Sequence, residues 1–270
     1  MSSLSVVVED LPGWQGSTLA ALIPAFSQRL PAGTRFGVTG SVATGTVDGL
    51  SDLDLIAVAD ALPDGAGDLT MLSAAGPVWS IDRQRGQGER TLRVVYRDGR
   101  RVDLLLRTTA SGLPDPVLWL DPVAAPPDVP PSPTLTEVPD PARPEVLAVR
   151  HVAALAAAKA GRRDLLIGGH LCLEVARLAL VFSMQARDQE EGRSHHHHGG
   201  RRDHDAVRVS DALSGLPTEA GPGEWIDLLL RLTHAFDAAA GTRWPDHRPD
   251  WQGLDAIVVA ARTALADQTE

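Results

Sequence analysis

A run of prolines divides this chain into two parts that must fold differently. Eleven prolines lie in the segment 114–144. Proline fixes φ and lacks a backbone donor, so this stretch cannot be a regular helix or a central strand. We expect a semi-extended connector at 113–144 between a first domain at 1–112 and a second at 145–270. Part of the connector should dock on the first domain, because three of its residues are too apolar to remain in water: Leu118, Trp119 and Leu120.

The two parts show different hydrophobic periodicities. Before the connector, a helical pattern at 17–30, with Ser17 as its N-cap, precedes short apolar runs and a hairpin at 91–106 around Asp98-Gly99. After the connector, four segments have helical spacing: 145–160, 164–187, 224–239 and 250–266. The sequence therefore predicts an α+β protein, with a mixed β-sheet and helices in the N-terminal domain and an α-helical C-terminal domain.

The most specific pattern is Gly40-Ser41, followed after ten residues by Asp52-Leu53-Asp54. An apolar strand at 36–38 leads into the Gly-Ser turn, and a second strand begins on the two acids. Side chains alternate along a strand, so Asp52 and Asp54 should share one face. Neighbouring carboxylates repel unless a cation lies between them. Hard oxygen ligands beside a Gly-Ser turn suit Mg²⁺ that holds a nucleoside triphosphate.

Residues 35–59, which contain this pattern, resemble the polymerase-β-like nucleotidyltransferase superfamily. The two-domain plan is most like its antibiotic nucleotidyltransferases, which adenylylate aminoglycosides or lincosamides. The resemblance implies a Mg-dependent nucleotidyltransferase that moves a nucleoside monophosphate, such as AMP from ATP, onto a hydroxyl of a small-molecule acceptor. It also implies that Gly40 and Ser41 bind the phosphates, and that Asp52, Asp54 and a third carboxylate hold two Mg²⁺ ions.

Asp103 is the candidate for that third carboxylate. It stands within the apolar run 102–106, where an acid is costly unless it has a partner. In the resembled family the third carboxylate comes from a later strand, so Asp103 would hold metal and could take the proton from the acceptor hydroxyl. The alternative is an acid on a solvent-facing edge strand, paired with Arg93 or Arg101.

Two further candidates lie on predicted helices of the second domain. Glu174 shares a helix stripe with His170 and Arg177, and it is a candidate base or acceptor ligand. The alternative is a partly exposed helix with a Glu174–Arg177 ion pair. Lys159 lies at a helix end, where it could contact the triphosphate or interact with the helix dipole.

Composition bounds the partners. The net charge is −10, which argues against a nucleic-acid substrate and suits a cationic small molecule. The single cysteine allows no intrachain disulfide, and the first residues show no secretory signal. Charged residues, which a membrane-spanning helix would rarely carry, interrupt the apolar run 165–184. We expect a cytoplasmic protein without a membrane span, as a monomer or a homodimer.

Three alternatives stay open. The four histidines at 195–198 could bind metal, but a solvated loop explains them better. The Gly-Ser and Asp-x-Asp spacing also suits a toxin–antitoxin-type nucleotidyltransferase that modifies protein or tRNA. The third alternative is not an enzyme: it is a catalytically silent scaffold that binds nucleotide.

Overall fold

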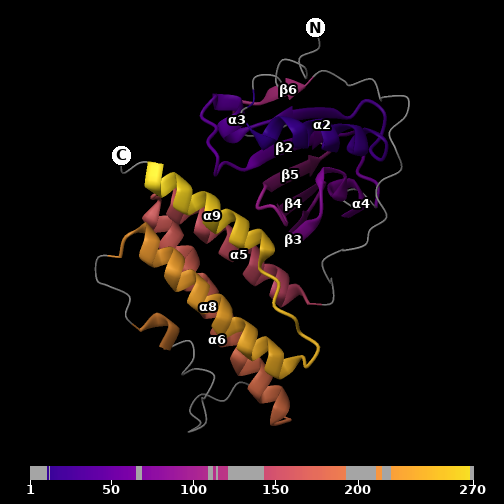
Figure 1. The fold of residues 1–270 in the computed structure, drawn as a ribbon. Helices are drawn as coiled ribbons and strands as arrows, with labels where there is room; N and C mark the ends of the chain where they lie inside the picture. Colours follow the sequence, from indigo (N-terminus) through magenta and orange to yellow (C-terminus); the bar gives the residue numbers. More distant parts are fainter. Residues whose placement is uncertain are drawn as a thin grey trace. The chain divides into compact units, whose positions relative to one another are not determined.

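The chain divides into two compact units, Met1–Pro141 and Ala142–Glu270. We consider each by itself (Figure 1). The computed structural model describes residues 11, 13–64, 69–108, 112–113, 115–120, 143–192, 211–214 and 220–267. The four histidines at 195–198 lie outside the described residues.

The first unit is built on a six-stranded mixed sheet with the order β3-β4-β5-β2-β1-β6. Strands β2 and β5 run parallel, and the other neighbours are antiparallel. The strands are β1 (Arg35–Val38), β2 (Leu53–Val58), β3 (Val78–Gly86), β4 (Glu89–Tyr96), β5 (Arg101–Arg107) and β6 (Leu118–Leu120). A mixed sheet with helices is the architecture that the sequence predicted.

The two faces of this sheet differ in chemistry. Leu53 and Leu55 on β2 and Leu104 on β5 are buried, and they lie on one face. Asp54 and Asp103 lie on the other face, directly opposite each other. Strand alternation thus places the two acids together, on the face opposite these leucines.

Helix α2 (Trp14–Ser27) begins earlier than the sequence indicated. The predicted N-cap, Ser17, is wrong: it lies in the first turn, where its hydroxyl donates to the carbonyl of Trp14 at 3.0 Å. Pro24 lies inside the helix. The short helices α3 (Gly40–Thr44), α4 (Leu69–Leu72) and η1 (Ser73–Ala75) complete the helical part of the described first unit.

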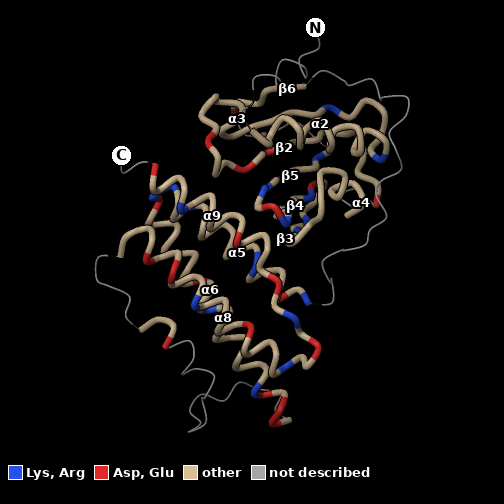
Figure 2. The backbone as a smooth tube through the Cα atoms, in the orientation of Figure 1, with Lys and Arg blue, Asp and Glu red and all other residues tan. Residues whose placement is uncertain are grey.

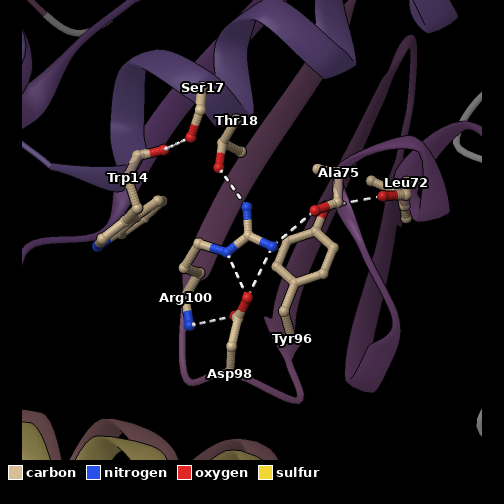
Figure 3. A network of polar contacts seen from close by, with 8 residues as sticks. All are labelled: Trp14, Ser17, Thr18, Leu72, Ala75, Tyr96, Asp98 and Arg100. Carbon is tan, nitrogen blue, oxygen red and sulfur yellow. Dashed lines mark hydrogen bonds and ion pairs between the residues drawn. The ribbon is translucent and has the colours of Figure 1, made fainter.

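Arg100 joins the β4–β5 turn to the helices of the first unit (Figure 3). Its guanidinium donates to Thr18 Oγ1 on α2 at 2.8 Å, to the Ala75 carbonyl at 2.6 Å and to Asp98 Oδ2 at 2.8 Å. Beside it, the buried Tyr96 hydroxyl donates to the Leu72 carbonyl at 2.8 Å. One side chain therefore fixes α2, η1 and the turn together.

Strand β6 comes from the Pro-rich segment and was not predicted as a strand. It pairs with β1 and places Trp119 opposite Gly37. A Cβ on Gly37 would lie 2.8 Å from Val117 Cγ1 and 3.1 Å from the Trp119 ring. The missing side chain at Gly37 is what allows β6 to approach β1.

The described part of the second unit is helical. Its long helices are α5 (Pro144–Gly161), α6 (Leu165–Glu190), α8 (Pro222–Arg243) and α9 (Gln252–Asp267). Helix α5 packs against α6, α8 and α9. By length and composition α6 could cross a membrane, with mean hydropathy 1.8 over its most apolar window, but the core helix of a soluble bundle passes the same test.

Candidate active site

Gly40 lies against the carboxylate of Asp54. Gly40 follows β1 with φ +61°, and a Cβ there would stand 2.1 Å from Asp54 Oδ2. The amide of the preceding Thr39 donates to the Asp54 carbonyl at 3.0 Å. No side chain larger than hydrogen fits at residue 40 without displacing the acid, so the structure brings together the Gly-Ser segment and the Asp-x-Asp strand.

The Gly-Ser segment is a short helix rather than a simple turn. Helix α3 starts at Gly40 and ends before Gly45, which has φ 69°. The Ser41 carbonyl accepts from the Thr46 amide at 2.9 Å. The Ser41 hydroxyl oxygen is buried and has no hydrogen-bond partner among the described residues. A buried unpaired hydroxyl is rare, and it marks this position as one that a ligand oxygen could satisfy.

A small hydrogen-bonded loop fixes the approach to the two acids. Asp48 Oδ1 accepts from the Leu50 amide at 2.8 Å and from the Ser51 hydroxyl at 3.0 Å. Ser51 Oγ in turn accepts from the Asp48 amide at 2.9 Å. The sequence analysis missed this role of Asp48 and Ser51, although an Asp followed three residues later by Ser is a recognisable turn signal.

The three acids influence one another electrostatically. Burial raises the pKa of Asp54 from 3.8 to about 6; the charge of Asp52 adds to the rise, and Arg101 opposes it. Burial raises the pKa of Asp103 from 3.8 to about 7; Asp52 and Asp54 add to the rise, and Arg93 and Arg101 oppose it. Such mutual repulsion is what a bound cation would relieve.

Asp103 lies on an interior strand. β5 has β4 on one side and β2 on the other, so the edge-strand alternative is wrong about the strand. That alternative is right about one partner, because Arg93 Nε stands 3.6 Å from Asp103 Oδ2. Arg101 is buried and donates to the Leu50 carbonyl, at the loop that leads to the acids. The sequence analysis did not include Arg93 or Arg101 among the predicted site residues.

The donor chemistry of the site fits Mg²⁺. Among the residues that the structure describes, no three His, Cys, Asp or Glu side chains converge into a ready-made metal cluster. Mg²⁺ is usually held by one or two carboxylates together with water and substrate phosphates rather than by an all-protein cage. Asp52 and Asp54, with Asp103 opposite Asp54, supply hard oxygen donors of that kind.

Lys159 and Glu174, the candidates in the second unit, both have ion-pair partners there. Lys159 Nζ on α5 stands 3.5 Å from Asp164 Oδ2. Glu174 on α6 pairs with Arg177 at 2.5 Å, and hydrogen bonding from Arg177 lowers the pKa of Glu174. This pair is the alternative arrangement that the sequence allowed for Glu174.

No protein-family model matches the sequence, and no curated protein sequence matches it. Among solved structures, the crystal structure of an aminoglycoside 6-adenyltransferase from Bacillus subtilis is similar over 94% of this chain and 99% of that chain. The TM-score is 0.31 and the sequence identity is 12%. This likeness is weak, and it carries no conclusion about the activity of this chain.

Proposed function

We propose that this protein is a Mg-dependent nucleotidyltransferase that moves a nucleoside monophosphate, such as AMP from ATP, onto a hydroxyl of a small molecule. The observation that carries the proposal is the close approach of Gly40 to the Asp54 carboxylate. Asp103 lies directly opposite Asp54 on the neighbouring strand. The spacing of Gly40-Ser41 and Asp52-Leu53-Asp54 in the sequence supports it.

Different residues of the first unit would bind the phosphates and the metal ions. The backbone of Gly40 and the amide and hydroxyl of Ser41 would bind the terminal phosphates, since the missing side chain at residue 40 permits close approach. Asp52, Asp54 and Asp103 would hold two Mg²⁺ ions, which supply positive charge to the entering and leaving oxygens.

In the reaction, the acceptor oxygen would form a bond to the α-phosphorus while the bond to the β-phosphate bridging oxygen breaks and pyrophosphate leaves. The acceptor proton would pass to Asp103, which lies opposite Asp54 on the neighbouring strand. Glu174 is the weaker candidate base because Arg177 lowers its pKa. We keep it as a candidate acceptor ligand, and Lys159 as a candidate phosphate contact.

The net charge of the chain indicates which class of acceptor it would bind. The net charge of −10 would attract a cationic molecule and repel a polyanion. A polyamine sugar such as an aminoglycoside fits that field, and lincosamides are the second group to be tested. The proposed partner is therefore a cationic small molecule rather than nucleic acid.

The test is a product assay with mass detection. The protein is incubated with Mg²⁺, ATP and a pool of aminoglycosides and lincosamides, and the expected product is an acceptor heavier by one AMP. Asp54→Asn should abolish the product, whereas Asp60→Asn, at an exposed acid just beyond β2, should not. Full activity in Asp54→Asn would refute the metal-binding role. AMP found on protein or tRNA would favour the toxin–antitoxin type, and nucleotide binding without any product would favour a silent scaffold.

A further inference from the structure

A row of four charged residues crosses four strands on the face of the sheet that carries Asp54 and Asp103. Asp82 on β3 is opposite Arg93 on β4, Arg93 is opposite Asp103 on β5, and Asp103 is opposite Asp54 on β2. Directly opposed residues lie on the same face. Figure 2 marks the acidic and basic positions of these strands. The row therefore extends the candidate site by two residues, Asp82 and Arg93.

Arg93 is held more closely by Asp82 than by Asp103. Its Nη1 donates to Asp82 Oδ2 at 3.1 Å, whereas its Nε stands 3.6 Å from Asp103 Oδ2. The first distance is that of a hydrogen bond and the second is not. Gln84 Nε2 also donates to Asp82 Oδ2, at 3.3 Å, which helps to hold the Asp82 carboxylate.

We propose that Asp82 is a positioning residue that anchors Arg93 and so keeps the Asp103 carboxylate available to a divalent cation. The inference rests on the proposed function, because it assigns Asp103 to the metal. Arg93 and a metal ion compete for the same carboxylate, since both are cations that need its oxygens. Without its anchor, the guanidinium would be free to bind Asp103 with two hydrogen bonds, the preferred geometry between arginine and a carboxylate.

Two single substitutions should change metal affinity in opposite directions. Asp82→Asn removes the anchor charge, so Arg93 moves onto Asp103 and metal affinity falls. Arg93→Gln removes the competing cation, so metal affinity rises. In the double variant the Arg93 guanidinium is absent, so Asp82→Asn should have little effect in the Arg93→Gln background. That dependence is what distinguishes an anchor from an acid that merely adds negative charge.

The chain offers a matched control on the same two strands. Glu89 on β4 pairs with Arg107 on β5 at 3.2 Å, and the two are directly opposed four residues along from the Arg93–Asp103 pair. Glu89→Gln removes the same kind of charge from the same kind of cross-strand pair. It should leave metal affinity unchanged.

The experiment measures Mn²⁺ affinity by electron paramagnetic resonance with a non-hydrolysable ATP analogue present, and checks folding by circular dichroism. We expect Asp82→Asn to weaken Mn²⁺ binding about tenfold, as substitutions behind metal ligands commonly do. We expect Arg93→Gln to strengthen it and the double variant to match Arg93→Gln. Unchanged affinity in Asp82→Asn, the same loss in both backgrounds, or an equal loss in Glu89→Gln would overturn the inference. Absence of Mn²⁺ binding in the unsubstituted protein would instead refute the proposed function itself.

Discussion

Removing the charge of Asp103 should make the metal-free protein more stable. The pKa of Asp103 rises from 3.8 to about 7 on folding, chiefly through burial and then through Asp52 and Asp54. The folded state therefore binds the Asp103 proton more tightly than the unfolded state does. Stability falls as pH rises through this interval, and the full cost of the charged carboxylate is present above about pH 7.

The magnitude follows from the rise in pKa. About three pH units at 1.36 kcal/mol each give an upper limit of about 4 kcal/mol. The side chain is still 33% exposed, so solvent screening reduces this to about 1–2 kcal/mol. Asparagine has nearly the shape of aspartate and carries no charge. In Asp103→Asn, Arg93 also keeps its ion pair with Asp82.

The assay is urea unfolding of the unsubstituted protein and Asp103→Asn at several pH values without metal. The variant should be more stable by about 1–2 kcal/mol near pH 8, and the difference should fall by more than half near pH 5. Asp60→Asn, at an exposed acid, should change nothing. Added Mg²⁺ and ATP analogue should stabilise the unsubstituted protein more than the variant. A variant that is less stable at pH 8 would show that the Asp103 charge is already neutralised in the fold.

Three other substitutions test separate parts of the structure. Gly40→Ala should lower the free energy of unfolding by about 2 kcal/mol or more and abolish nucleotide transfer, because its Cβ would collide with the Asp54 carboxylate. Gly45→Ala is the control: Gly45 has φ +69° but open space around it, so this variant should lose only about 1 kcal/mol of unfolding free energy and keep activity. Urea unfolding and product assays would measure both effects. Ser41→Ala should leave the unfolding free energy nearly unchanged, because its hydroxyl has no partner among the described residues, yet weaken triphosphate binding measured by calorimetry. Arg100→Met should cost about 2–3 kcal/mol in urea unfolding, because charged hydrogen bonds to α2 and η1 are lost.

Local chemistry made much of the first unit predictable. Alternation in 91–106 and the Asp98-Gly99 turn are sufficient to specify the β4–β5 hairpin, and Gly99 has φ 84° as such turns require. The same alternation places Asp103 on the opposite face of β5 from buried Val102 and Leu104. Patterns of this kind are short in range, and they are therefore readable from one sequence.

Pairing between distant segments was not predictable in the same way. Nothing local indicates that Leu118–Leu120 adds to β1, because this depends on the space left by Gly37. The contact of Arg93 with Asp82 and Asp103 requires the register of three strands, and a shift of one residue would place it on the other face. The start of α2 at Trp14 was missed because Ser17 is a good N-cap by type.

The stability cost of the acids is itself an argument about function. The fold supports Asp54 and Asp103 with pKa values raised to about 6 and about 7, and a chain under no constraint but stability could replace either with an uncharged residue. It also leaves Gly40 without the side chain that would cover Asp54, and it leaves the Ser41 hydroxyl buried without a partner among the described residues. The charged acids and the unpaired hydroxyl are each unfavourable alone, and a metal–triphosphate complex would relieve both, since cations neutralise the carboxylates and phosphate oxygens satisfy the hydroxyl. A purely structural role would explain each of these costs separately, but not their occurrence together on β2, the neighbouring β5 and the segment that follows β1.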